Sequence, residues 1–322
     1  MSIPLITIIG AQKGGTTNLR RNLLTHPLVS GMPNEVHFFD RSPESYPKLG
    51  RWPGDGRERE LGPGVVGRIL SEYAKTCLDD GKPLNKPATS KNVAAMARGI
   101  IVESSPRYML CPIVPYRMKM VRPLAKLVVV LRDPTVRYFS QLRMVMCRKH
   151  PLEGFASLEE EIDAFFHTPG DARGYLERGT EAYQPYGALC RGENATAVDL
   201  WDCFRRMKAQ NPLHRGLYAD QLERWFRVYD RSQIMVVDSS EMFLDFIGTV
   251  ARVAEWAGLP KHDFEYDQHE FSGTCSRRPN QPDFFAAGGR YEAMLEEEEL
   301  FREWYRPHTE RLEKLLGRKM LW

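Results

Sequence analysis

Short apolar runs rich in β-branched residues recur along the chain of 322 residues and predict strands that are buried on both faces. They lie at residues 5–9, 100–102, 127–131 and 234–237. Apolar positions at helical spacing follow the first, third and fourth runs, and segment 291–322 has the same spacing. Such alternation is typical of parallel strands joined by crossover helices. We therefore predict an α/β fold with a central parallel sheet flanked by helices.

Two stretches of the chain fit neither a core strand nor a core helix. Residues 41–98 and 150–212 are rich in proline, glycine and charged side chains, for example in RWPGDGRERELGPG and HTPGDARGY. We interpret both as partly helical insertions around the α/β core and not as separate domains. The whole chain, residues 1–322, is therefore predicted to form a single domain.

The stretch GAQKGGTT at residues 10–17 joins the first predicted strand to the first predicted helix and is typical of a phosphate-binding loop. The backbone N–H groups that would point at an anion belong to Gly14, Gly15, Thr16 and Thr17. The nucleoside triphosphatase pattern G-x-x-x-x-G-K-[ST] requires a lysine directly after its second glycine. Thr16 holds that place here, and the lysine of the loop is Lys13. A monophosphate group without a β/γ pair explains this displaced lysine better than a triphosphate does.

Two further motifs carry side chains suited to catalysis or anion binding. In NEVHFFD, residues 34–40, Glu35 and His37 project to the same side of an extended segment, as a general-base pair would. The third predicted strand ends in LRDP, so Arg132 lies at the carboxyl edge of the sheet and Ser140 on the next helix. Ligands of open α/β sheets bind at this edge, and an arginine with a serine suits a second phosphate. In the alternative interpretation, Arg132 pairs with Asp133 or with a surface acid.

Composition and charge limit the classes of function. Hydrophobic residues are 42% and charged residues 27% of the chain, as in a soluble globular protein. The formal net charge of +3 is too small to predict a nucleic-acid partner. The six cysteines contain no C-x-x-C pair, and the eight histidines form no metal-ligand cluster with them. We therefore predict no metal site and mostly reduced thiols.

Targeting signals are also missing from the sequence. No apolar run approaches the roughly 18 residues of a membrane span, and no signal peptide precedes the first predicted strand. We expect a cytoplasmic protein without a membrane span, or a lumenal one if an N-terminal anchor has been removed. The sequence does not predict an oligomeric state.

Together these motifs resemble the sulfotransferase superfamily that uses 3′-phosphoadenosine 5′-phosphosulfate (PAPS) as its donor. Within it, the chain looks most like the heparan sulfate 3-O-sulfotransferases and related carbohydrate sulfotransferase domains. The resemblance spans almost the whole length and rests, in chain order, on IIGAQKGGTT, NEVHFFD, VESSPRY, VVVLRDPTVRYFS, RGLYADQLERWF and RPHTERLEKLLGRKMLW. It implies a P-loop-like sheet in which the two insertions surround an acceptor cleft.

The resemblance implies a set of donor-binding residues. Lys13 would contact the oxygen that bridges the phosphate and the sulfate, and Arg132 and Ser140 would hold the 3′-phosphate. The loop residues around the 5′-phosphosulfate would be Gly14, Gly15, Thr16 and Thr17. Gly289 and Arg290, in AAGGRYEA, would close over the 3′-phosphate.

The resemblance also implies an acceptor side of the site. Glu35 would be the catalytic base, assisted by His37. Asp40, Ser104 and Arg107 are the candidates for contact with the acceptor. The carbohydrate-specific members often have a lysine where VESSPRY has Ser104 or Ser105, so this chain departs from them there.

The sequence thus predicts a PAPS-dependent sulfotransferase. The sulfuryl group would move in line to a hydroxyl or amine of a saccharide or a small hydroxylated metabolite, would release adenosine 3′,5′-bisphosphate (PAP), and would need no metal. One alternative is a nucleotide kinase or triphosphatase with a degenerate loop, since the strand at 234–237 ends in an acid, Asp238. The other alternative is a non-catalytic nucleotide-binding protein.

Overall fold

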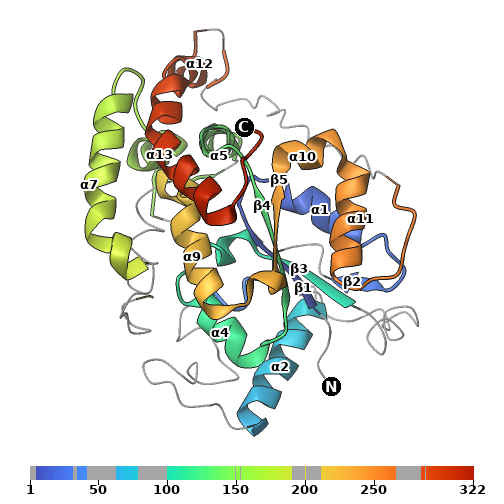
Figure 1. The fold of residues 1–322 in the computed structure, drawn as a ribbon. Helices are drawn as coiled ribbons and strands as arrows, with labels where there is room; N and C mark the ends of the chain where they lie inside the picture. The colour runs from blue at the N-terminus through green and yellow to red at the C-terminus, as the bar shows by residue number, and fades with distance from the viewer. Residues whose placement is uncertain are drawn as a thin grey trace.

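The computed structural model describes residues 5–31, 35–41, 63–78, 100–148, 150–152, 154–190, 200, 212–265, 284–286 and 288–322. Five parallel strands form one sheet in the order β2-β3-β1-β4-β5 (Figure 1). Their bounds are β1 Leu5–Gly10, β2 Val29–Gly31, β3 Ile100–Ser104, β4 Lys126–Leu131 and β5 Ile234–Asp238. The four predicted strands are confirmed. Strand β2 has three residues, too few to give a periodic pattern.

Strand β1 lies at the centre of the sheet, and the chain leaves it in two directions. It forms β2 and β3 on one side of β1 and then β4 and β5 on the other side. The carboxyl ends of β1 and β4 therefore flank the point at which the strand order reverses. Open α/β sheets bind their ligands in the crevice at this point. The glycine-rich loop follows β1, and Arg132 follows β4, so the fold brings both to this edge of the sheet.

Alternate side chains of β4 enter two separate cores, which is why the strand is continuously apolar. Val128 and Val130 lie in the core beneath α1 (Thr16–Leu23) and α11 (Phe246–Trp256), with α10 (Ser239–Leu244) beside them. Leu127, Val129 and Leu131 lie in the core on the opposite face. Strand β4 is thus packed on both of its faces, which fixes the position of its carboxyl end.

The second face of the sheet is covered by α4 (Val114–Val121), α9 (Tyr218–Val228) and α2 (Pro63–Leu78) (Figure 1). Trp225 and Leu222 of α9 are fully buried there. Near the end of the chain, Leu312 of α13 (Glu298–Leu316) joins the same core. The predicted C-terminal helix is therefore confirmed, and it is preceded by the short helix α12 (Arg290–Leu295).

A third hydrophobic cluster lies around α5 (Pro134–Met146), the helix that follows Arg132. Most of its other members come from α6 (Leu158–Phe165), α7 (Ala172–Cys190), α12 and α13. The rings of Tyr138 on α5 and Phe301 on α13 lie 4.6 Å apart, centroid to centroid. Aromatic pairs at this separation are favourable, so the C-terminal helices brace the helix beside the sheet edge.

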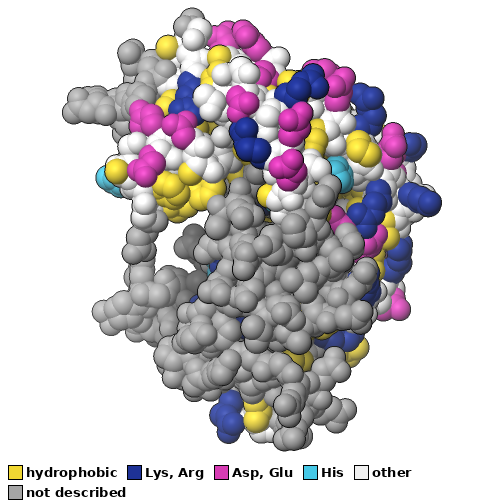
Figure 2. All heavy atoms as spheres, turned by 90° about the vertical axis from the view of Figure 1, so that its left-hand side faces the viewer, with side chains coloured by type: hydrophobic (Ala, Val, Ile, Leu, Met, Phe, Trp, Pro, Cys, Tyr) yellow, Lys and Arg dark blue, Asp and Glu magenta, His cyan; other side chains and the backbone are white. Residues whose placement is uncertain are grey.

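The two expected insertions contain helices where they are described. Helix α2 lies within 41–98, and α6 and α7 lie within 150–212, so the prediction of partly helical segments is confirmed for these parts. Residues 42–62, 79–98, 153, 191–199 and 201–211 of these segments lie outside the described residues. In the described part of the face seen in Figure 2, basic and acidic side chains are interspersed, a pattern typical of a solvated surface.

The prediction of mostly reduced thiols stays a prediction, with one exception among the described residues. Cys111 is free and buried, but Cys147, which caps the C-terminal end of α5, is disulfide-bonded. Spacing along the sequence does not reveal this disulfide, because its formation depends on the distance between two cysteines in space. Within the described residues, no helix is long and apolar enough to cross a membrane.

Candidate functional site

The glycine-rich loop is fixed by main-chain contacts with β4. Ala11 N donates to Val130 O at 2.8 Å, and Gly14 N donates to Ala11 O at 2.9 Å. A Cβ on Gly14 would lie 2.4 Å from Val130 O, so only glycine fits there. Gly15, the N-cap of α1, has φ of 105°, a conformation that favours glycine. Because Gly15 has no side chain to cap α1, the N–H groups at Thr16 and Thr17 can bind an anion.

Three cations lie close to one another next to this loop: Lys13, Arg132 and Arg137. Burial lowers the pKa of Lys13, and the charges of Arg132 and Arg137 lower it further. Arg132 Nη1 donates to Lys13 O at 3.3 Å, and burial lowers the pKa of Arg132 as well. Like charges that are held together in a half-buried crevice favour an anionic ligand. Arg137, which the sequence interpretation missed, is fully buried on α5 and donates to Gln141 Oε1 at 2.7 Å.

Arg132 is directed at the loop and not at its neighbour Asp133. Asp133 caps α5, where Oδ1 accepts from Thr135 N at 2.7 Å, and its Oδ2 accepts from Arg302 Nη1 at 2.7 Å. The structure therefore contradicts the alternative interpretation in which Arg132 forms an ion pair with Asp133. Ser140 lies half-buried on the same helix, beyond the capped first turn.

The start of α12 lies beside these cations. Gly289 is the N-cap of α12, and Arg290 is the first residue of the helix. Burial raises the pKa of Tyr291, and the charges of Arg143 and Arg132 oppose that shift, so the three side chains are near one another. The guanidinium of Arg290 is paired with Asp163 of α6. Tyr291, two residues after Gly289, thus lies within electrostatic range of Arg132, whereas Arg290 already has an acidic partner.

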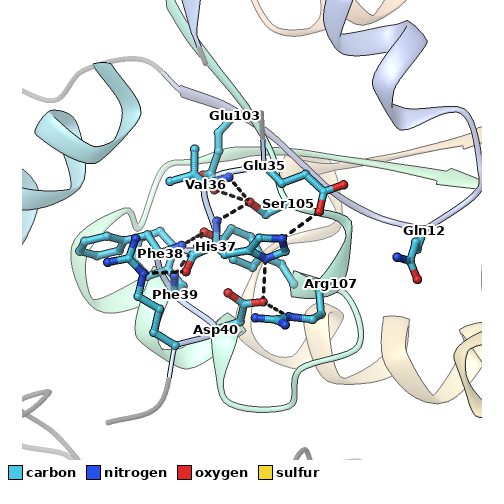
Figure 3. A network of polar contacts seen from close by, with 12 residues as sticks. Gln12, Glu35, Val36, His37, Phe38, Phe39, Asp40, Glu103, Ser105 and Arg107 are labelled. Carbon is cyan, nitrogen blue, oxygen red and sulfur yellow. Dashed lines mark hydrogen bonds and ion pairs between the residues drawn. The ribbon is translucent and has the colours of Figure 1, made fainter. Parts of the chain in front are cut away.

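The predicted Glu35–His37 pair is present, and Asp40 extends it (Figure 3). His37 Nε2 lies 2.8 Å from Glu35 Oε2, and His37 Nδ1 lies 3.0 Å from Asp40 Oδ2. Burial alone would lower the pKa of His37, but these two carboxylates outweigh it and raise the pKa to about 9. At neutral pH the imidazole is therefore protonated, and it donates from both ring nitrogens.

Asp40 and Ser104 are almost fully buried, which favours a supporting role over the expected contact with an acceptor. Burial would raise the pKa of Asp40, but hydrogen bonds from His37 and Arg107 reverse the direction and lower it. Glu35, by contrast, is exposed, and Arg107 is half-buried. Glu35 is therefore the carboxylate of this group that a ligand can reach.

Arg215 links the two parts of the site and was missed by the sequence interpretation. It lies in η3 (Leu213–Gly216) and donates to Gln12 Oε1 of the loop. Gln12 lies across from Glu35 in Figure 3. Burial lowers the pKa of Arg215, Arg137 and Arg107 lower it further, and Glu35 opposes them. The sequence feature that could have identified Arg215 is the motif RGLYADQLERWF, which begins with this residue.

The same motif anchors the end of β4. Tyr218 OH donates to Arg132 O at 2.9 Å. At Gly216, a Cβ would lie 2.6 Å from the ring of Tyr305 and 2.9 Å from Pro134 Cβ. The glycine therefore allows η3 to pack against the start of α5, next to Arg132.

The acid at the end of β5 has a structural task. Asp238 is fully buried and is the N-cap of α10. Its Oδ1 accepts from Ser240 N at 2.8 Å, and its Oδ2 accepts from Leu321 N at 2.8 Å. These bonds engage both oxygens, which disfavours Asp238 as the Mg²⁺ ligand of a triphosphatase. Among the described residues, no three His, Cys, Asp or Glu side chains gather as a metal site.

Comparison with known proteins gives an independent result. The family described as "Sulfotransferase domain" matches residues 4–272. Heparan sulfate glucosamine 3-O-sulfotransferase 3A1 of Mus musculus is 24% identical over 331 residues, which cover 99% of this chain but only 64% of that protein. Heparan sulfate glucosamine 3-O-sulfotransferase 5 of Homo sapiens is 24% identical over 328 residues, 99% of this chain and 74% of that protein.

A solved structure supports the fold. The crystal structure of a sulfotransferase from Alicyclobacillus acidocaldarius matches with a TM-score of 0.53 at 24% identity. The match covers 99% of this chain and 98% of that one. The shared architecture is the parallel sheet with its flanking helices, as predicted.

Proposed function

Because the chain belongs to the sulfotransferase domain family, we propose that it transfers a sulfuryl group from PAPS to a hydroxyl or amine of a saccharide or a small hydroxylated metabolite. The observation that carries this proposal is the place of Lys13. It lies in the loop after β1, its carbonyl oxygen accepts from Arg132, and Arg137 is close to its ammonium group. This arrangement suits one phosphate with a transferable group attached to it.

The residues of the crevice fit the two anionic ends of such a donor. The N–H groups at Gly15, Thr16 and Thr17 would hold the 5′-phosphosulfate at the start of α1, whereas the predicted N–H of Gly14 is already bound to Ala11 O. Arg132 and Ser140 would hold the 3′-phosphate, with Gly289 at the nearby start of α12. Arg290 would first have to leave Asp163, so we give it the weaker role of the two.

The lysine would act on the leaving group. As the acceptor atom bonds to sulfur, the bond between sulfur and the bridging oxygen breaks, and negative charge develops on that oxygen. The ammonium group of Lys13 would stabilise this charge. No β/γ phosphate pair has to be neutralised, so the proposal needs no metal ion.

Glu35 would accept the proton of the acceptor group. Its Oε2 is bound to His37, so Oε1 can meet an acceptor. His37 would orient Glu35, and Asp40 and Arg107 would hold His37 in turn. The relatives named for heparan sulfate glucosamine make a saccharide the first acceptor class to test. The single-domain organisation and the cytoplasmic location stay predictions.

The test is transfer of labelled sulfate from PAPS to a panel of saccharides, phenols, alcohols and amines, with and without EDTA. We expect a labelled product whose yield does not depend on EDTA. Mg²⁺-dependent ATP turnover without sulfate transfer would instead support a kinase or triphosphatase. Tight PAP binding without transfer to any member of the panel would support a non-catalytic nucleotide-binding protein.

A further inference from the structure

A buried carboxylate, Glu103 on β3, lies next to Ser105 and beside the Glu35–His37 pair (Figure 3). Three hydroxyl groups surround it. Ser105 Oγ donates to Glu103 Oε1 at 3.0 Å, and the hydroxyl of Tyr73 on α2 donates to Oε2. The hydroxyl of Tyr108, in η2 (Pro106–Tyr108), is close enough to the same carboxylate to lower its pKa. Burial raises the pKa of Glu103, and hydrogen bonds from these converging hydroxyls oppose that shift by favouring the anion.

Two of these hydroxyls also accept hydrogen bonds from four consecutive backbone amides. Ser105 Oγ accepts from Val36 N at 3.1 Å and His37 N at 3.0 Å, and Tyr108 OH accepts from Phe38 N at 2.7 Å and Phe39 N at 3.2 Å. A hydroxyl has one proton to donate and two lone pairs with which to accept. With its proton directed at Glu103, the Ser105 hydroxyl has every hydrogen-bonding group engaged.

This pattern imposes an irregular backbone on residues 36–39. Neighbouring amides of a strand point in opposite directions, so four successive amides held by two adjacent hydroxyls exclude a regular strand. His37 has φ of 51°, an uncommon value for a residue other than glycine. In this conformation Glu35 and Asp40 reach the two ring nitrogens of His37. The hydroxyls therefore stabilise the backbone on which the acid–base group depends.

We propose that Glu103 is a positioning residue for sulfuryl transfer: its carboxylate directs the hydroxyl protons of Ser105 and Tyr108, so that their lone pairs hold the segment carrying Glu35. This inference rests on the proposed function, because Glu103 acts through Glu35 as the base. It assigns a reaction-specific task to a buried group that lies outside the donor-binding crevice.

The charge of Glu103 matters as much as its shape. The Glu103→Gln substitution preserves the shape but places an NH₂ donor where a hydroxyl now donates. That hydroxyl must then turn its own proton toward the backbone amides, and two donors would face each other. We expect the segment to shift and kcat to fall by about 10- to 100-fold, the scale of loss when reacting groups are misplaced by about 1 Å.

The three hydroxyls provide a matched comparison. Tyr108→Phe and Tyr73→Phe each remove one hydroxyl from Glu103, but only the first also removes the acceptor of two amides. We expect Tyr108→Phe to lower kcat by about 10- to 100-fold and Tyr73→Phe to lower it much less. Titration with PAP counts the folded, binding-competent molecules, and the KM for PAPS should stay at the wild-type value in both variants.

A double variant separates positioning from general damage. If Tyr108 acts through Glu35, the Glu35→Gln/Tyr108→Phe protein should be no slower than Glu35→Gln alone. Losses that multiply, or equal losses in Tyr108→Phe and Tyr73→Phe, would overturn the proposal.

Titration of His37 followed by NMR gives a readout that needs no acceptor. The pKa is about 9 when both carboxylates contact the ring, and it should move toward its ordinary value in Glu103→Gln and Tyr108→Phe. An unshifted titration in both variants, with wild-type transfer intact, would overturn the role of Glu103 alone. Absence of transfer by the wild type to any acceptor would overturn the proposed function, and the positioning role with it.

Discussion

The loop at residues 10–17 and the segment at residues 35–41 form the two sides of the site, and they are held in different ways. The loop is held by the main chain, since Ala11 N donates to Val130 O of β4 and Gly14 N donates to Ala11 O. The segment is held by side chains that come from elsewhere in the chain, namely Ser105, Tyr108 and the buried Arg117, which donates to Phe39 O at 3.1 Å.

The difference suggests a division of labour. A loop made of backbone N–H groups binds a phosphate whatever the neighbouring side chains are, which suits a constant donor. A segment held by side-chain hydroxyls can be altered by single substitutions, which suits a part that has to match an acceptor. Changes in the loop should therefore affect the donor and the leaving group, and changes around the segment should affect proton removal.

The largest expected effect in the loop comes from Lys13→Ala. Loss of one group that stabilises developing charge lowers kcat by about 10²- to 10³-fold. PAP has no sulfuryl group and no bridging oxygen, so its dissociation constant should change little. Steady-state kinetics and PAP calorimetry measure both quantities. A loss of PAP affinity as large as the loss of kcat would mean that Lys13 binds the nucleotide and does not act on the leaving group.

Arg132→Ala should weaken donor binding more than it slows the chemical step. One charge-assisted hydrogen bond to a phosphate contributes about 1.5–3 kcal/mol, which corresponds to about a 10- to 100-fold rise in the dissociation constant of PAP. Arg302→Ala is the matched control, because it removes a neighbouring guanidinium that pairs with Asp133 and Glu298. Equal losses of PAP affinity in the two variants would contradict a direct phosphate contact by Arg132.

Gly14→Ala should destabilise the folded protein by about 1–3 kcal/mol, because the new Cβ would lie 2.4 Å from Val130 O. Gly67→Ala on α2 is the control, since nothing lies within 4 Å of a Cβ at that position. The free energy of unfolding in urea measures both. Equal stability of the two variants would show that the loop can move away from β4.

The smallest expected effect is the pH dependence that His37 brings to the segment. Its pKa is raised to about 9 in the folded protein from 6.5. The resulting stabilisation is therefore fully present below about pH 6.5 and is lost as the pH rises through about 9. Discounted for the partly exposed ring, it amounts to about 1–2 kcal/mol. Unfolding at pH 7 and pH 10 should reveal this loss in the wild type but not in His37→Gln.

The sequence predicted the loop side of the site well because local rules determine it. Glycines in a strand–turn–helix pattern specify where N–H groups point, and the carboxyl end of a buried strand specifies where Arg132 lies. Strand β2 was not predicted because it is short. Arg215 was not predicted because its partner Gln12 is about two hundred positions away in the chain, and local sequence patterns do not cover such a separation.

The segment side was predicted by residue type but not by geometry. Glu35 and His37 were chosen as neighbours on one face of an extended strand, yet they meet because His37 has a left-handed backbone. That backbone depends on hydroxyls near position 105, which local spacing cannot reveal. The disulfide of Cys147 was missed for the same reason, since pairing depends on tertiary proximity.

The division between a donor loop and an acid–base segment is tested most directly by Glu35→Gln in a single experiment. PAP affinity and the single-turnover rate of sulfate transfer would be measured on the same preparation. We expect unchanged PAP affinity and a rate lowered by about 10²- to 10⁴-fold, because the acceptor loses its base while the loop stays intact. A rate close to that of the wild type, or a loss of PAP affinity parallel to the loss of rate, would contradict it.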